Sequence, residues 1–573
     1  MRNPFEYEAA NNLSEEDILD YYIEDHNFSR FIISPRNIFL TGERGTGKTM
    51  TLLYYSAKIE YLKSKKEKRE FDFHNIGIHI PCKTPLIYKQ EYELLNDFKA
   101  YLVSEHYLTL YIANELVTSL HAIREIENAF IKHNLKLKND FEYLTGEALP
   151  SEKSFLESIS IFSHREVIKT QRKINSPDFD EFYNNTYSLN SLILPLLEMI
   201  KSVPFMGNAH FMFMLDDAHD LNSFQKKIVN SWIAYRDHSN YSFKVAITSE
   251  KEYHFTTASG GSIIEDHDFT KVEKENPFRN SRSDFGKMAK DIIERRLSLY
   301  NINISAEHFF PTNPSMIKGL EEAKEIVRKE YLTKNPSASQ KQVSDYVYKY
   351  HRAYYFGQRH SKANLPPYSG LEIIVQLSTG VIRNLLAPCH EMFEMVLSNQ
   401  QINNSNIKEI SPTIQTEAIK SISKRKWESI EHLHRNIEGC SENDKNYILN
   451  MFNNLMTLFR DRLQSNLSEP RAIKFIITEH KSEAMRKLEH LLLIAQKAQL
   501  LYMRTGRSKD DGKHTSYYEP NRLLLPDRGL DPIGQHSEIS IKSTDLWAAA
   551  SKNKRLKEAT QLLQPPTLFD DYD

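Results

Sequence analysis

Residues 42–49 read Gly-Glu-Arg-Gly-Thr-Gly-Lys-Thr and satisfy the pattern G-x-x-x-x-G-K-[ST] at every required position. This feature restricts the fold most, because such a loop has meaning only between a strand and a helix. Residues 37–41 form the short apolar run that a buried parallel strand needs. Residues 50–68 then place apolar side chains at helical spacing, and no proline interrupts them. The order of strand, glycine loop and helix predicts an α/β core built around a phosphate-binding loop.

The residue types in the loop suit a nucleotide triphosphate. Glycines let the backbone approach the phosphates, and the loop N–H groups with the helix N-terminus attract the negative charge. Lys48 would reach the β- and γ-phosphates, and the Thr49 hydroxyl would ligate Mg²⁺. The alternative is an incidental glycine turn before a helix. The residues expected to bind the nucleotide are Gly42, Glu43, Arg44, Gly45, Thr46, Gly47, Lys48, Thr49 and Met50.

A second motif supplies carboxylates at the end of another strand. Residues 211–215 are a continuous apolar run, and Asp216 and Asp217 follow it directly. Ligands of open α/β sheets gather at the carboxyl ends of the strands. We expect Asp216 to bind Mg²⁺ and Asp217 to orient the attacking water as general base. An N-cap pair before a helix is the alternative interpretation.

A third apolar run, residues 241–250, carries Thr248 and Ser249 at its carboxyl end. A hydroxyl at this place could contact the γ-phosphate and report its loss. The signal is weak by itself, because hydroxyl side chains end many strands.

Three motifs in this order resemble an AAA+ ATPase. Residues 377–386 add a Gly-x-x-Arg step, Gly380 and Arg383, inside a helical pattern. The step resembles the sensor-2 helix of AAA+ lid domains, whose arginine reaches back to the phosphates. A lid followed by a further C-terminal part resembles the origin-recognition (initiator-type) branch, in which a winged-helix domain follows the lid. The resemblance implies ATP and Mg²⁺ as ligands and ATP hydrolysis as the reaction. Some bacterial relatives of this branch belong to defence or mobile-element systems.

The sequence departs from the AAA+ pattern at the catalytic base, which is normally glutamate and here is Asp217. An Asp-Asp pair is similar to the Walker B motif of STAND-type signalling ATPases, and it favours slow turnover. No arginine finger can be assigned from the sequence. The candidates are Arg279, Arg282, Arg295 and Arg296, and the alternative for each is a solvated position on a helix.

The pattern along the chain predicts four parts. Residues 1–31 form a helical lead-in, and residues 32–300 form the ATPase core, with further strands at 75–80 and 269–274. A helical insertion at about 84–204 interrupts this core, because the stretch exceeds an ordinary crossover. Its apolar stripes favour packing over a partner groove. Residues 301–400 form an all-α lid, and residues 401–573 form a winged-helix-like domain with an acidic tail.

The C-terminal part contains a predicted strand at 472–478, a helix at 483–501 and a hairpin around Asp511-Gly512. Lys509 and Lys513 flank the hairpin tip. Residues 481–509 hold seven basic side chains against two acidic ones, which predicts contacts with DNA phosphates. The basic residues are Lys481, Arg486, Lys487, Lys497, Arg504, Arg507 and Lys509. The leucine-rich helix 483–501 must also be largely core, and winged helices serve as protein-interaction modules as well.

The formal net charge of −2 shows no global basic field, so nucleic-acid binding requires a local patch. Three cysteines and the acidic start, with no apolar signal segment or 18-residue apolar stretch, predict a cytoplasmic protein. The sequence therefore predicts a slow AAA+ initiator-like ATPase, a nucleotide-dependent switch that engages double-stranded DNA. The alternative is a STAND-like signalling or defence ATPase that senses a protein partner. A homo-oligomer or a partner bound through the insertion is open in both cases.

Overall fold

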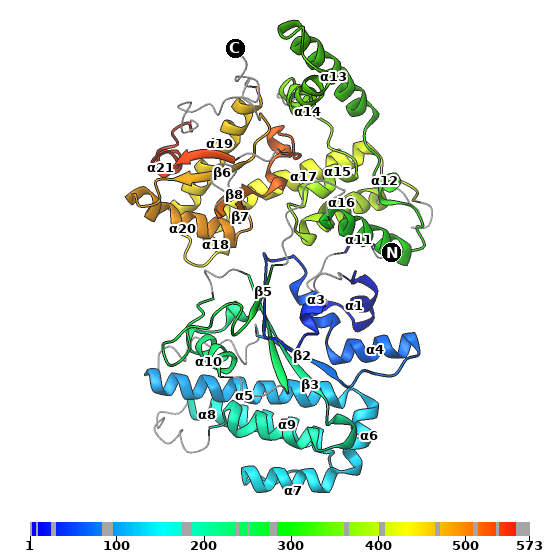
Figure 1. Cartoon of the computed structure of the whole chain (residues 1–573), viewed down its shortest axis with the longest axis vertical. Coiled ribbons are helices and arrows are strands. Elements are labelled where there is room, and N and C mark those ends of the chain that lie inside the picture. Colours follow the sequence, from blue (N-terminus) through cyan, green and yellow to red (C-terminus); the bar gives the residue numbers. More distant parts are fainter. Residues whose placement is uncertain are drawn as a thin grey trace. The chain divides into compact units, whose positions relative to one another are not determined.

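The computed structural model describes residues 3–6, 10–24, 30–82, 96–174, 186–235, 240–248, 253–273, 284–359, 366–399, 407–464, 470–507, 514–534 and 538–556. The chain forms two compact units (Figure 1). The N-terminal unit is Glu8–Asn276, and the C-terminal unit combines Met1–Tyr7 with Pro277–Asp573.

The N-terminal unit is built on a parallel five-stranded sheet in the order β2-β3-β4-β1-β5. The strands are β1 (Ile38–Thr41), β2 (Asn75–Pro81), β3 (His210–Asp216), β4 (Tyr241–Ile247) and β5 (Thr270–Glu273). All five were expected from apolar runs in the sequence, and the structure confirms them. Thr41 pairs in register with Ile247 of β4, and Pro81 with Asp216 of β3. The phosphate loop, Asp216 and Thr248 therefore lie at the same edge of the sheet.

Each face of this sheet has its own core, because successive side chains of a strand point to opposite faces. Phe39, Phe213 and Val245 belong to the larger cluster, which the insertion helices cover. Leu40 and Met214 belong to the smaller cluster, where Leu52 of α3 (Lys48–Tyr54) packs. The helix of the phosphate loop therefore covers the face to which Asp216 also points by alternation.

The single helix expected over residues 50–68 is wrong. α3 ends at Tyr54, and α4 (Ala57–Glu67) starts after a break at Tyr55 and Ser56. At the break the carbonyl of Tyr55 lies so close to Gly77 of β2 that a Cβ there would collide with it. The chain therefore turns at the point where Gly77, which has no side chain, leaves room for the Tyr55 carbonyl. The lead-in contributes a 3-10 helix (Ala10–Asn12) and α1 (Glu15–Tyr21), which packs on α3 and α4.

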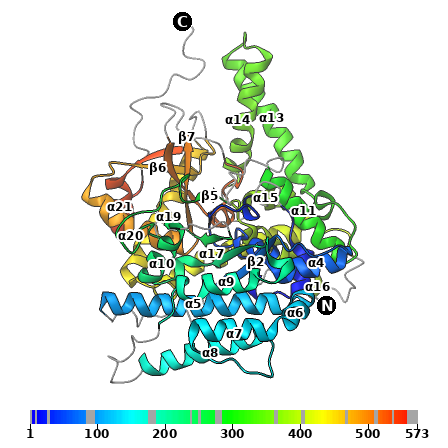
Figure 2. The same cartoon turned by 60° about the horizontal axis from the view of Figure 1, so that its bottom comes forward.

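The described residues between β2 and β3 are largely helical, as the sequence predicts. α5, α8 and α9 lie side by side in both views (Figure 1, Figure 2), and their apolar stripes join the larger core. The elements are α5 (Asp97–His121), α6 (Arg124–Lys132), α7 (Asn134–Thr145), α8 (Phe155–Ile174), a π-helical turn (Leu189–Ile193), α9 (Leu194–Lys201) and a 3-10 helix (Pro204–Met206). A 3-10 helix (Ala218–Asp220) and α10 (Ser223–Ala234) follow β3.

The C-terminal unit begins with helices around a core that also holds the first residues of the chain. Phe5 is fully buried against the rings of Phe309, Phe310 and Phe393. The helices are α11 (Asp284–Leu299), α12 (Ala306–Phe309), α13 (Pro314–Lys334), α14 (Gln340–Gly357), α15 (Leu371–Leu377), α16 (Ile382–Asn399), α17 (Pro412–Glu431), α18 (Leu433–Asn436) and α19 (Glu442–Leu463). α13 and α14 form a long antiparallel pair (Figure 1).

A second sheet, in the order β7-β8-β6-β9, completes this unit. Its elements are β6 (Lys474–Thr478), α20 (Glu483–Lys497), β7 (Leu501–Arg507), β8 (His514–Pro520), 3-10 helices (Arg522–Leu524, Pro526–Arg528), β9 (Glu538–Lys542) and α21 (Ser543–Lys552). β7 and β8 pair antiparallel, which confirms the two predicted hairpin arms. The turn with Asp511-Gly512, Lys509 and Lys513 lies outside the described residues, as does the acidic tail. β9 was not predicted. In the described parts of the chain, no helix is long and apolar enough to cross a membrane.

Candidate nucleotide site

The loop after β1 takes a shape that depends on its glycines. Gly45 and Gly47 have φ angles of 90° and 91°, in the left-handed region that side chains rarely adopt. Gly47 caps α3, and the Thr46 hydroxyl donates to the carbonyl of Glu43 at 2.8 Å. The loop therefore wraps back to the start of a helix, where backbone N–H groups attract anions. A cradle of this kind fits the phosphates of a nucleotide.

Lys48 is the first residue of α3 and is buried. Its ammonium group donates to the carbonyl oxygens of Gly42 at 2.5 Å and Glu43 at 3.0 Å. The positive charge therefore lies over the inside of the loop, where it can meet β- and γ-phosphate oxygens.

Thr49 and Asp216 come together although 167 residues separate them. The Thr49 hydroxyl donates to Asp216 Oδ1 at 3.1 Å. The backbone N–H of Asp217 donates to the same oxygen at 3.1 Å. Hydroxyl and carboxylate oxygens are the ligands that Mg²⁺ prefers. Beside a phosphate loop, this pair of oxygens fits a nucleotide-bound magnesium ion.

His79 of β2 is a site residue that the sequence reasoning missed. Its Nε2 lies 3.3 Å from Asp216 Oδ2, so that both carboxylate oxygens have partners. The signal was available in the strand pattern. His79 interrupts the apolar run of β2 two residues before its end, at the edge where the Asp216 strand also ends.

Asp217 has a different environment from Asp216. Its backbone is left-handed, with φ of 52°, at the start of a 3-10 helix. Burial raises the pKa of Asp217, and the neighbouring Asp216 and Asp220 raise it further, while Lys48 and Arg44 lower it. A carboxylate with a raised pKa next to a phosphate loop is suited to accept a proton.

Arg44 links the loop to the segment after β3, which the sequence reasoning also missed. Its Nη2 lies 3.4 Å from His219 Nε2 and 3.9 Å from Asp220 Oδ1. His219 is buried, and its ring lies 3.6 Å from Asp220. The loop and the aspartate segment are thus joined at two points, through Thr49 and through Arg44.

For the remaining predicted site residues within the described part of the chain, the structure gives a position in the fold. Thr248 follows β4 at the edge where the loop lies, and Ser249 is outside the described residues. Met50 packs its side chain beside Ile18 and Tyr54. Arg383 is the exposed second residue of α16 in the C-terminal unit, so its reach to the phosphates stays a prediction.

The sequence allowed a solvated helix position for Arg296, and the structure shows that this alternative is wrong. It is buried, and its guanidinium donates to the carbonyl oxygens of Pro4 at 3.1 Å and Glu6 at 2.6 Å. It therefore anchors the start of the chain in the C-terminal unit. Arg295 is exposed, and Arg279 and Arg282 lie outside the described residues.

The predicted basic surface of the C-terminal part is smaller than its composition suggested. The side chain of Arg504 is 8% exposed and its Nε lies 3.7 Å from Glu519, so counting it among phosphate contacts was wrong. Of the seven predicted basic residues, Lys481, Arg486, Lys487 and Lys497 are exposed. The side chain of Arg507 and the whole of Lys509 lie outside the described part of the chain. Leu488, Leu491, Leu492 and Ile494 of α20 are buried, which confirms that this helix is largely core.

A parallel sheet with a phosphate loop after β1, and an aspartate joined to the loop hydroxyl, defines a P-loop nucleotide-binding protein. The family model described as ORC-CDC6-like matches residues 3–541. The chain belongs to this ORC-CDC6-like family, and it is therefore an AAA+ ATPase of the initiator type.

A solved structure of the Aeropyrum pernix Orc1 protein in complex with DNA is similar to the chain at 10% identity. The match covers 90% of this chain and 97% of that chain, with a TM-score of 0.28. No curated protein sequence matches the chain.

Proposed function

We propose that the protein binds ATP with Mg²⁺, hydrolyses it slowly in the cytoplasm, and engages double-stranded DNA in a nucleotide-dependent way. The contact between Thr49 and Asp216 carries this proposal, because it puts a magnesium donor set beside the phosphate loop. Lys48 would neutralise the phosphates, and Asp217 would act as general base. Thr248, Ser249 and Arg383 would report the state of the γ-phosphate.

The slow rate follows from the Asp-Asp pair. A catalytic aspartate is shorter than glutamate by about one carbon–carbon bond, roughly 1.5 Å, so its carboxylate stands further from the attacking water. We propose the STAND-like Walker B character on this ground. The four-part division at residues 31, 300 and 400 is likewise our proposal, with the core regulating the parts that follow it.

DNA contact rests on the C-terminal sheet and its neighbouring helix. The hairpin β7–β8 and the exposed Lys481, Arg486 and Lys487 of the α20 region suit a winged-helix-like module on a DNA backbone. Lys487 also pairs with Glu483 at 2.8 Å, which reduces its share of phosphate binding. Affinity that decreases steeply with salt is the expected signature.

The decisive experiment measures ATP hydrolysis by the full chain with and without double-stranded DNA. Lys48→Ala should abolish ATP binding, whereas Asp217→Ala should keep binding and lose hydrolysis. Lys58→Ala, a lysine in the neighbouring helix α4, is the matched control. Unchanged ATP binding in Lys48→Ala would refute the nucleotide site. Hydrolysis that ignores DNA would refute the DNA-engaging switch.

A second candidate function is a signalling or defence ATPase that senses a protein partner. Exposed apolar side chains on the insertion favour it, since aromatic and apolar side chains at a surface are groups that a protein partner buries on binding. Tyr143 is 89% exposed and Leu135 75% exposed on α7, and Ile131 of α6 is 55% exposed. Stimulation of hydrolysis by a protein rather than by DNA, lost in Tyr143→Ser, would establish this function instead.

A further inference from the structure

The turn before α16 has a backbone shape that needs external support. Thr379 has a φ of 54°, and Gly380 has a φ of 78°. A β-branched residue in the left-handed region is strained and persists only where its surroundings hold it. Ser378 and Thr379 are fully buried. Arg383 emerges from α16 four residues after Thr379, so the shape of this turn sets where Arg383 starts.

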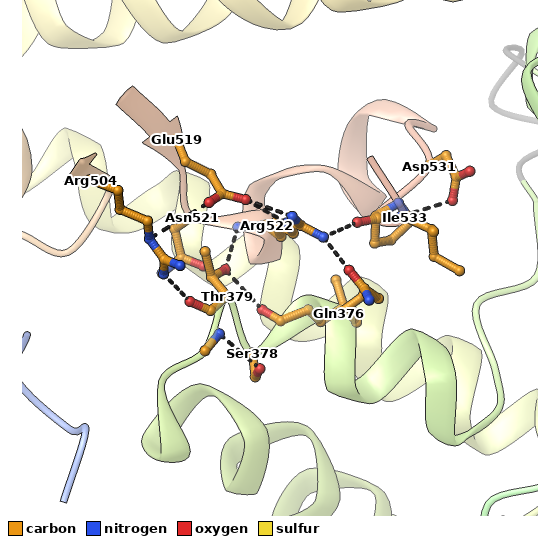
Figure 3. A network of polar contacts seen from close by, with 12 residues as sticks. Gln376, Ser378, Thr379, Arg504, Glu519, Asn521, Arg522, Asp531 and Ile533 are labelled. Carbon is orange, nitrogen blue, oxygen red and sulfur yellow. Dashed lines mark hydrogen bonds and ion pairs between the residues drawn. The ribbon is translucent and has the colours of Figure 1, made fainter. Parts of the chain in front are cut away.

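The support comes from the C-terminal sheet (Figure 3). The backbone N–H of Arg522 donates to the Thr379 hydroxyl at 3.0 Å. The guanidinium of Arg504, from β7, donates to the carbonyl of Thr379. The guanidinium of Arg522 also donates to the side chain of Gln376 in α15. The side-chain hydroxyl and the backbone carbonyl of Thr379 therefore each accept a hydrogen bond from an arginine in or next to the hairpin β7–β8.

Glu519 of β8 holds these two arginines in place. Its carboxylate accepts from Arg522 Nε at 2.8 Å and lies 3.7 Å from Arg504 Nε. Burial alone would raise the pKa of Glu519, but Arg522, Arg504 and Lys474 outweigh it and lower the pKa to about 2. The carboxylate stays charged, and the paired arginines cannot turn away from the turn without leaving a buried charge.

A second set of hydrogen bonds joins the first turn of α16 to β7 and to the residue that follows β8. The Asn384 side chain donates to the Tyr502 hydroxyl at 2.9 Å and to the Ser378 carbonyl at 3.3 Å. Asn521 donates to the same hydroxyl at 3.1 Å. Tyr502, Asn521 and Ser378 are all buried. Asn384 is the residue after Arg383, so the bonds flank Arg383 on both sides.

We propose that Arg504, Glu519 and Arg522 are positioning residues for Arg383. They hold the turn at residues 378–381, so that the hairpin β7–β8 and the first turn of α16 move as one body. A displacement of the hairpin then also displaces the backbone from which Arg383 starts. This inference rests on the proposed role of Arg383 in ATP hydrolysis.

The test is a double-mutant cycle between Thr379 and Arg383 in the full chain. Thr379→Val removes the hydroxyl that accepts from Arg522 and keeps volume and branching, while Thr379→Ser keeps the hydroxyl. We expect Thr379→Val to lower kcat/KM for ATP at least about tenfold, since small displacements at a catalytic group are costly. Thr379→Ser should stay near wild type. In an Arg383→Ala background, Thr379→Val should have no further effect.

Additive effects of the two substitutions would overturn the inference and leave the proposed function standing. Arg383→Ala with unchanged hydrolysis would remove the role of Arg383 and the inference together. Circular dichroism checks that each variant folds. If Thr379→Val does not fold, Arg504→Gln takes its place in the cycle, because it removes the guanidinium that donates to the Thr379 carbonyl and pairs with Glu519.

Discussion

Two aspartates follow each other at the end of β3, and their environments suit two different tasks. Asp216 is buried, its carboxylate accepts from the Thr49 hydroxyl and the backbone N–H of Asp217, and it lies 3.3 Å from His79 Nε2. Asp217 leaves the strand in a left-handed conformation, and burial raises its pKa. When two neighbouring carboxylates have different environments, one can bind a ligand while the other transfers a proton.

At this scale we predict that Arg44→Ala moves the acid limb of the pH profile to higher pH. As the proposed general base, Asp217 works only when it is unprotonated, so the rate should fall as the pH falls through its pKa. Arg44 lowers that pKa, and its removal therefore raises it. Because Arg44 is half exposed, we expect a shift of only a few tenths of a pH unit. The measurement is kcat/KM for ATP between pH 5 and 8.

Arg69→Ala is the control for this profile, because Arg69 pairs with Glu60 and Glu67 on the surface of α4. Its profile should coincide with that of the wild type. A profile of Arg44→Ala that stays in place or moves to lower pH would contradict the assignment of Asp217 as the base.

At the scale of elements, the break between α3 and α4 depends on Gly77. A side chain there would collide with the carbonyl of Tyr55 and the methyl group of Met214. We predict that Gly77→Ala lowers the free energy of unfolding by about 1–3 kcal/mol, the range for overpacked cores. Gly207→Ala is the matched control, since its nearest atom would lie at 3.8 Å. Urea unfolding of both variants checks the prediction, and equal midpoints would contradict it.

Local patterns explain which elements the sequence could predict. The strands and the phosphate loop each depend on neighbours in sequence, so apolar runs and glycines were sufficient. The break at Tyr55 was not predictable, because the helical spacing continues through it and its cause lies in β2. β9 pairs with β6 across 64 residues, between Lys474 and Glu538, and carries no strong local signal.

The interactions of charged residues were likewise predictable only where the sequence carries a local motif. Thr49 and Asp216 could be paired in advance because both belong to motifs with known chemistry. Arg504 was counted as exposed because its burial depends on Glu519, which lies on the paired strand. Arg296 was misjudged because its partners are carbonyls at the start of the chain, which no side-chain pattern announces.

At the scale of the whole molecule, the chain passes between its two compact units twice. Residues before Glu8 belong to the C-terminal unit, and the chain returns to that unit at Pro277. The first residues are firmly held there. The Asn3 side chain donates to the His390 carbonyl at 3.0 Å and to Glu394 at 2.8 Å, and Arg296 holds the next carbonyls. Both ends of the N-terminal unit therefore continue along the chain into residues of the C-terminal unit.

We predict that Phe5→Ala destabilises the C-terminal unit and leaves nucleotide affinity unchanged. Phe5 is fully buried among three phenylalanine rings, and truncating such a side chain costs about 3–5 kcal/mol. In a Trp232→Phe background, the remaining Trp427 and Trp547 report only the C-terminal unit. Their fluorescence during urea unfolding should show a lower midpoint for Phe5→Ala. Phe98→Ala is the control, because Phe98 is 70% exposed on α5 of the N-terminal unit. A midpoint shared by the two variants would show that the first residues do not anchor the C-terminal unit, and a loss of ATP affinity in Phe5→Ala would show that their effect is not confined to that unit.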